Sequence, residues 1–129
     1  MPLRILVVDD DPISLKLTTA VLLHAGFEVD SARDAETALV RVRERPLDVV
    51  LLDIQLPTMD GLTLAGIIKS DERTRHLRLI ALTAYAMKRD EARALAAGCD
   101  GYLSKPIDTT LLPLQIAQYE GLISAASTR

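Results

Sequence analysis

The chain is poor in aromatic residues and carries no excess of positive charge. One Phe, three Tyr and no Trp occur among its 129 residues, so it has few of the side chains on which nucleic-acid bases stack. Its formal net charge of −3 argues the same way, because phosphate backbones attract clustered Lys and Arg. These shortages predict that nucleic acid is not a partner.

Cysteine and long apolar runs are also scarce. The one cysteine, Cys99, cannot form an internal disulfide, which favours a reducing compartment. No stretch approaches the ~18 apolar residues of a membrane span. The apolar run near the start is too short for a signal peptide, and acidic residues follow it at once. We therefore expect a soluble, cytoplasmic protein without a membrane partner.

The composition is that of one globular domain. Apolar residues make up 49% of the chain and charged residues 26%, a balance that suits a folded protein rather than a disordered one. A chain of this length can bury a core of its own. We expect residues 1–123 to form the domain and residues 124–129 a flexible tail.

Short apolar runs alternate with helical segments along the chain. These runs lie at residues 5–8, 27–32, 49–52, 79–82 and 101–103. Asp11 and Asp34 are placed as helix N-caps, and Gly26 and Gly98 as helix ends. The continuous apolar runs are typical of parallel strands covered by helices on both faces, and the weaker second and fifth runs indicate edge strands. The alternation predicts an α/β fold with a five-stranded parallel sheet.

Polar residues follow the apolar runs, where an open parallel sheet binds its ligands. They are Asp9, Asp10, Asp53, Thr83 and Lys105. Each alone has a plainer explanation as a cap, a turn residue or a surface charge, but together they supply complementary chemistry. Two like charges 4 Å apart repel by roughly 4 kcal/mol at an effective dielectric of 20, so clustered carboxylates need a cation. An all-oxygen site predicts Mg²⁺.

The motifs that carry these residues resemble the receiver domain of bacterial two-component response regulators, in particular the stand-alone, chemotaxis-regulator-like kind. The motifs read VVDDD, LLDIQLPTMDG, ALTAY and GYLSKP, and the resemblance covers about residues 3–120. It implies a flavodoxin-like receiver fold with strand order 2-1-3-4-5. It also implies a protein that is not an enzyme, apart from autocatalytic aspartyl phosphorylation and dephosphorylation.

The resemblance assigns roles to the residues of the predicted site. Asp53 would be the phosphoacceptor, taking a phosphoryl group from a histidine kinase or a histidine phosphotransfer protein. Mg²⁺ would be bound by Asp10, Asp53 and the backbone carbonyl of Gln55, and by Asp9 partly through water. Lys105 would pair with the phosphoryl oxygens.

Further residues would carry the response to phosphorylation. Thr83 would hydrogen-bond the phosphoryl group, and Tyr102 would turn inward as the neighbouring loop moves. Gln55 and Tyr85 would tune the lifetime of the aspartyl phosphate. The resemblance also implies a cis peptide bond at Pro106.

The downstream protein target would bind the face formed by the fourth helix, the fifth strand and the fifth helix. Pro113 falls in the expected fifth helix, about five residues after a plausible Asp108 cap, so that helix is expected to start late or to kink. Because only one helix and a tail follow Ile107, the output is expected to be a partner protein or onward phosphotransfer.

Three alternatives stay open at this point. The chain could be a receiver excised from a hybrid histidine kinase, or a pseudo-receiver that only docks proteins. A phosphatase of the haloacid dehalogenase type would use Asp9 and Asp11, with Lys105 as its lysine, but further elements of that family are missing and the chain is short for it.

Overall fold

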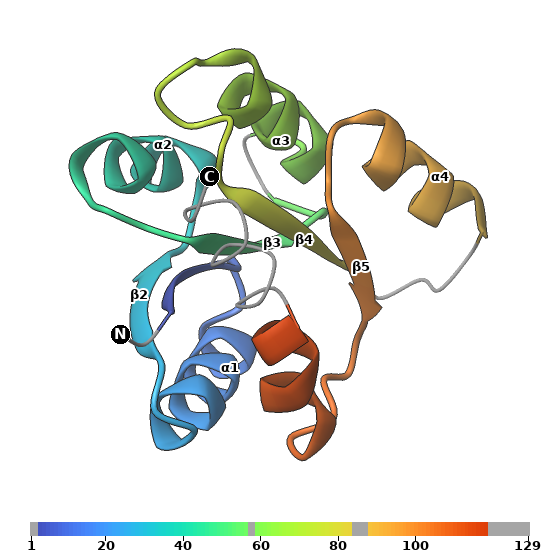
Figure 1. Ribbon diagram of the computed structural model, residues 1–129. Coiled ribbons are helices and arrows are strands. Elements are labelled where there is room, and N and C mark those ends of the chain that lie inside the picture. Colours follow the sequence, from blue (N-terminus) through green and yellow to red (C-terminus); the bar gives the residue numbers. More distant parts are fainter. Residues whose placement is uncertain (1–2, 57–58, 84–87, 119–129) are drawn as a thin grey trace.

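A five-stranded parallel sheet forms the centre of the protein (Figure 1). The computed structural model describes residues 3–56, 59–83 and 88–118. The strand order is β2-β1-β3-β4-β5, which confirms the predicted fold and the two edge strands. The strands are β1 Arg4–Val8, β2 Glu28–Ala32, β3 Val49–Asp53, β4 Arg78–Thr83 and β5 Gly101–Ser104. The helices are α1 Pro12–His24, α2 Ala35–Glu44, α3 Gly61–Ser70 and α4 Lys88–Ala96, and residues 111–118 are also helical.

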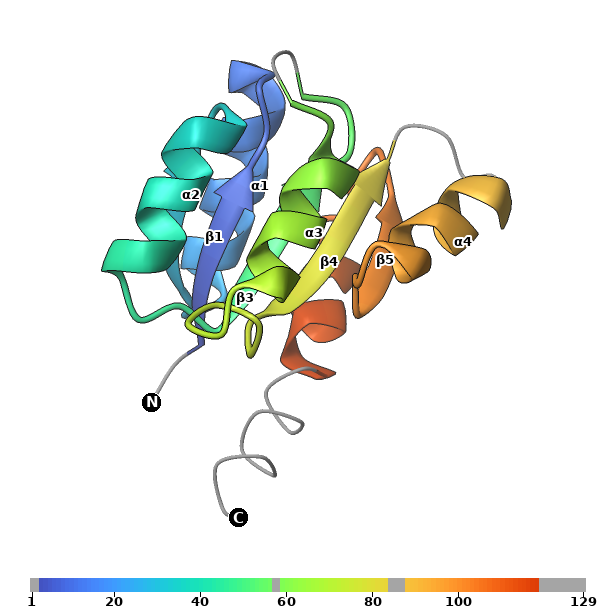
Figure 2. The ribbon, with the colours of Figure 1, turned by 90° about the horizontal axis from the view of Figure 1, so that it is seen from above.

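Helices cover both faces of the sheet, so the sheet separates two apolar cores. Side chains alternate along each strand: Leu6 and Val8 belong to the core beneath α2 and α3, whereas Ile5 and Val7 pack with α1 and the helix at 111–118. Both sets are buried, which explains the continuous apolar runs of the sequence. Figure 2, turned by 90°, shows β1 and β4 running in the same direction, so their carboxyl ends meet at one edge.

The helix boundaries follow the predicted caps. The side chain of Asp11 accepts a hydrogen bond from the amide of Ile13, and that of Asp34 from the amide of Thr37. Gly26 and Gly98 follow the ends of α1 and α4 with φ angles of 96° and 104°. A side chain is strained in that left-handed conformation, so glycine is favoured at both positions.

The helix at residues 111–118 starts late, as Pro113 predicted. Asp108 accepts hydrogen bonds from the amides of Thr110 and Leu111 at 2.9 and 3.0 Å. The amide of Leu112 also donates to the carbonyl of Asp108 at 2.9 Å. Pro113 comes next and has no N–H to donate to the carbonyl of Thr109, and regular helix is described only from residue 111.

Asp108→Ala is expected to lower the free energy of unfolding by about 1 kcal/mol, because two backbone amides lose their acceptor. Chemical denaturation of the variant and of Asp108→Asn, which can still cap, would measure the difference. Equal losses in both variants would contradict a capping role.

Two predicted features lie outside the described residues: Tyr85 and the tail at 124–129. Among the helices of the described residues, none has the length and apolar character needed to cross a bilayer.

Candidate functional site

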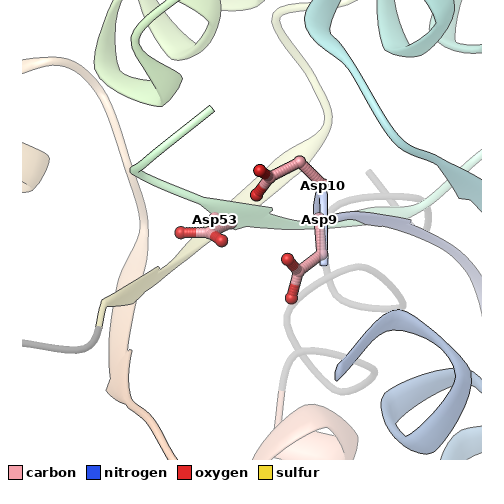
Figure 3. Close-up of side chains that lie close together, drawn as sticks. All are labelled: Asp9, Asp10 and Asp53. Carbon is pink, nitrogen blue, oxygen red and sulfur yellow. The ribbon is translucent and has the colours of Figure 1, made fainter. Parts of the chain in front are cut away.

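Three carboxylates meet at the carboxyl edge of the two central strands (Figure 3). Val8 of β1 pairs with Leu52 of β3, so Asp9 and Asp53 come next at the same level of the sheet. Asp10 joins them from the start of the following loop. Carboxylate oxygens of the three residues lie within 4.8 Å of one another. The sheet thus assembles residues that are more than forty positions apart in the sequence.

The ammonium group of Lys105 bridges two of these carboxylates. Its Nζ lies 2.9 Å from Oδ2 of Asp9 and 2.9 Å from Oδ2 of Asp53. The backbone brings Lys105 there by extending the pairing of β5 with β4, since the Lys105 amide donates to the carbonyl of Thr83 at 2.7 Å. The peptide bond between Lys105 and Pro106 is cis.

Asp53 is buried at the tip of β3, with 5% of its surface exposed. Burial raises the pKa of its carboxyl, and the nearby charge of Asp9 adds to this effect. Hydrogen bonds from the Gln55 amide and from Lys105 oppose the rise in pKa without cancelling it. The ionised carboxylate of Asp53 is therefore poorly solvated, and any further positive charge beside it would stabilise it.

Asp9 is buried as well, but its pKa moves the other way. Burial is the largest single influence and acts to raise this pKa. Hydrogen bonds from Lys105, from the amide of Asp11 and from the hydroxyl of Ser14 together outweigh burial and hold the pKa below its ordinary value. Burial likewise acts to lower the pKa of Lys105, yet its bonds to Asp9 and Asp53 raise that pKa overall. Asp9 and Lys105 thus form an ion pair beside Asp53.

The remaining predicted residues surround this centre in different ways. Asp10 is exposed and opens the carboxylate cluster to solvent. Thr83 ends β4 and is buried, with 3% of its surface exposed. The side chain of Gln55 is exposed, whereas Tyr102 is half-buried on β5 and packs against the core beneath α2 and α3.

One residue that shapes the site was not predicted from the sequence. Gly61, the first residue of α3, is buried against the chain that follows β3, and its amide donates to the carbonyl of Ile54 at 2.8 Å. A Cβ at Gly61 would lie 2.4 Å from the carbonyl oxygen of Asp53 and 2.7 Å from Cα of Ile54. The adjacent Asp60 caps α3 by accepting from Leu62. An Asp-Gly pair signals a cap or a turn, but not this close approach.

The donor set fits a hard divalent cation. Three carboxylates face one ammonium group, so the site keeps an excess of negative charge even with Lys105 in place. Carboxylate oxygens are the ligands that Mg²⁺ prefers, and the exposure of Asp10 leaves room for bound water. The acidic cluster can therefore hold a metal ion.

Comparison with known proteins agrees with this geometry. The sequence model described as the response regulator receiver domain matches residues 5–117, nearly the whole chain. The chain belongs to the response regulator receiver family. Family membership removes the haloacid dehalogenase alternative, because that phosphatase belongs to a different family.

Similar receivers occur alone and within larger proteins. The polar-differentiation response regulator DivK of Brucella anthropi is 38% identical over 121 residues, which are 94% of this chain and 98% of the relative. The receiver domain of the sensor histidine kinase PA1611 from Pseudomonas aeruginosa, solved with a magnesium ion coordinated in its active site cleft, has a TM-score of 0.85 and 30% identity, covering 94% and 99% of the two chains. The receiver of an HD domain-containing protein from Pseudomonas fluorescens has a TM-score of 0.88 and 30% identity, covering 97% and 99%.

Proposed function

We propose that this receiver is the phospho-accepting switch of a two-component phosphorelay, with Asp53 as the phosphoacceptor. The observation that carries the proposal is the placement of Asp53. It is buried at the tip of a central strand, 2.9 Å from the ammonium group of Lys105 and beside two more carboxylates. A carboxylate in that position is oriented by a rigid sheet and is poorly solvated, both of which favour attack on an incoming phosphorus atom.

The transfer forms one bond and breaks one. A carboxylate oxygen of Asp53 attacks the phosphorus of a phosphohistidine or a small acyl phosphate, the O–P bond forms, and the bond to the leaving group breaks. When the donor is phosphohistidine, the imidazole nitrogen leaves and is protonated from solvent. Lys105 is already hydrogen-bonded to Asp53 and can pair with the phosphoryl oxygens as negative charge develops on them.

Mg²⁺ is the metal proposed for the acidic cluster. Asp10, Asp53 and the carbonyl of Gln55 would hold it directly, and Asp9 partly through water. When bound, it neutralises charge on the carboxylates and the phosphoryl group. The magnesium ion in the PA1611 receiver is consistent with this proposal.

The switch is proposed to run from the site to α4 and β5. Thr83 would hydrogen-bond the phosphoryl group, Tyr102 would turn inward, and Gln55 and Tyr85 would set how fast water reaches the aspartyl phosphate. Weak anchoring of α4 supports its movement: among the side chains described at 91–96, only Ala94 is buried.

The partners proposed for this switch are two proteins. A histidine kinase or a histidine phosphotransfer protein would be the donor, and a downstream protein would bind the face of α4, β5 and the helix at 111–118. Relatives include the response regulator DivK and the receiver of a sensor histidine kinase, so both the stand-alone form and the excised form have counterparts.

The proposal is tested by incubating the protein with Mg²⁺ and acetyl phosphate or beryllofluoride, followed by intact mass and backbone NMR. We expect one phosphoryl adduct and spectral changes that reach Thr83 and Tyr102, and neither in Asp53→Asn. Asp11→Asn is the matched control, because asparagine caps a helix as well as aspartate does. It should still accept phosphate. Absence of both adduct and beryllofluoride binding in the wild type would reject the switch in favour of a docking module.

A further inference from the structure

Helix α4 is firmly attached to the rest of the domain at its carboxyl end. The amide of Gly98 donates to the carbonyl of Leu95 at 3.1 Å. The amide of Cys99 donates to the carbonyl of Ala94 at 3.0 Å, and together the two bonds close the last turn in a Schellman motif. Cys99 and Ala94 are buried in the core that α4 shares with α3, on the same face of the sheet (Figure 1). Backbone bonds and apolar contacts therefore both hold the last turn of α4.

The turn that follows α4 is tied to β4 and to the end of α3. Oδ2 of Asp100 accepts from the ammonium group of Lys69 at 3.0 Å and from the amide of Leu79 at 2.9 Å. Lys69 also donates to the carbonyl of Leu77 at 2.7 Å. A Cβ at Gly98 would lie 2.9 Å from Cγ of Lys69, so the lysine stem lies directly against this turn. The turn is thus a fixed point at which α4 joins the sheet.

The earlier part of α4, which follows the carboxyl end of β4, is attached more weakly. The side chains at 91–93 are exposed. Arg93 nevertheless reaches α3, because its Nη2 lies 4.0 Å from Oδ2 of Asp60, and the two side chains are 57% and 47% exposed. An exposed ion pair of this kind is weak and is screened by salt. At this distance, a small displacement of either residue is enough to separate the two charges.

Asp60 connects this ion pair to the backbone of the phosphoacceptor. Its other carboxylate oxygen, Oδ1, accepts from the amide of Leu62 at 2.9 Å and caps α3. The next residue, Gly61, donates to the carbonyl of Ile54 at 2.8 Å, and its Cα lies so close to the carbonyl of Asp53 that a Cβ has no room. Movement of the backbone at Asp53 is therefore passed on to the cap of α3.

We propose that the ion pair between Asp60 and Arg93 is a latch that holds α4 in its resting position, and that residues 98–100 are the hinge about which α4 turns when the latch opens. The inference rests on the proposed phosphorylation of Asp53. Phosphorylation shifts the backbone that packs against Gly61, the cap of α3 follows, and Asp60 separates from Arg93. The exposed part of α4 then swings outward, while its last turn stays in place.

The latch predicts a change in affinity for a phosphoryl mimic. A contact made only in the resting state lowers the population of the active state, which the mimic binds preferentially. Arg93→Gln and Asp60→Asn should therefore each raise the affinity for beryllofluoride, with Mg²⁺ present, by about two- to fivefold. The Asp60→Asn variant keeps the cap of α3, because asparagine also caps helices. Since both substitutions remove the same contact, the double variant should gain no more than either single variant.

Titration of the full chain with beryllofluoride, followed by backbone NMR, measures these affinities. Arg73→Gln is the matched control, because it removes an exposed ion pair with Asp71, at 3.3 Å, beyond the opposite end of α3 from Asp60. It should leave the affinity unchanged. High salt should shrink the difference between the wild type and Arg93→Gln, since salt screens the latch. In Arg93→Gln without the mimic, the signals of 91–95 should move toward their beryllofluoride-bound positions, whereas those of Cys99 and Asp100 should not.

Four outcomes would overturn the proposal. Unchanged or lower affinity in Arg93→Gln, with normal binding by the wild type, would reject the latch and leave the phospho-switch intact. Additive gains in the double variant would show that Asp60 and Arg93 act separately. Shifts that extend equally to Cys99 and Asp100 would reject the hinge. A wild type that binds no beryllofluoride would remove the proposed function and the latch together.

Discussion

Replacing Lys105 with methionine is expected to lower the free energy of unfolding at neutral pH by about 3 kcal/mol. The Asp9 and Asp53 side chains are only 1% and 8% exposed, and Lys105 is the cation that bridges them at 2.9 Å. Without it, two buried carboxylates face each other uncompensated. Denaturation with urea at pH 7 would measure the loss, and Lys105→Arg, which keeps the charge, should lose less.

The same variant should show an altered dependence of stability on pH. In the wild type, the pKa of Asp9 lies below its ordinary value of 3.8, so ionised Asp9 stabilises the fold above that pH, and this contribution disappears as the pH falls through the folded pKa. The pKa of Asp53 is raised, so ionisation of Asp53 costs stability as the pH rises from 3.8 through its folded pKa. Removing Lys105 raises both pKa values, so the deficit of the variant should shrink in acid.

Two further measurements would establish that charge causes the loss. Asp53→Asn added to Lys105→Met should recover stability at pH 7, because one of the uncompensated charges is gone. Added Mg²⁺ should raise the melting temperature of Lys105→Met more than that of the wild type, since a bound cation replaces the missing charge. A deficit that is independent of pH and of Mg²⁺ would instead indicate lost packing of the lysine stem.

Gly61→Ala is expected to destabilise the protein by roughly 3 kcal/mol and to weaken Mg²⁺ binding and phosphoryl uptake. The added Cβ would sit 2.4 Å from the carbonyl oxygen of Asp53 and 2.7 Å from Cα of Ile54. Both obstacles are backbone atoms, so no side chain can rotate away to relieve the clash. Either α3 moves outward or the chain at Asp53 shifts, and the second would displace the site.

Gly66 provides a control with the opposite expected sign. It lies within the same helix, and a Cβ there would meet nothing within 4 Å. Gly66→Ala should therefore raise stability by about 0.5–1 kcal/mol, because alanine loses less backbone entropy in a helix than glycine does. Urea denaturation and Mg²⁺ titration of both variants would test the pair. Destabilisation by both substitutions would show that α3 tolerates no added methyl group, rather than that Gly61 is special.

Much of the architecture could be predicted from the sequence, because its causes are local. Continuous apolar runs mark strands that are buried on both faces. Helix starts are marked by capping bonds to near neighbours at Asp11 and Asp34, and helix ends by the backbone conformation of Gly26 and Gly98. The assembly of Asp9, Asp10 and Asp53 also follows from sequence, since parallel strands bring their carboxyl ends to one edge. The resemblance to receivers then assigned roles that composition could not.

Other features depend on packing between segments that are distant in sequence, and only the tertiary structure could decide them. The sequence placed Lys105 at the end of a strand, but its bridge between Asp9 and Asp53 depends on how β5 pairs with β4. The contact of Gly61 with the end of β3 depends on the angle at which α3 enters, which no cap signal specifies.

Helix α1 illustrates the same division. The sequence determined that α1 is a helix with apolar residues on most sides, but not which of them stay exposed. That depends on how far β2 and the helix at 111–118 cover it. Local patterns determine which residues form each element, because hydrogen bonds and caps act between near neighbours. Which side chains remain exposed, and which charged groups form ion pairs, is decided only when the elements pack together.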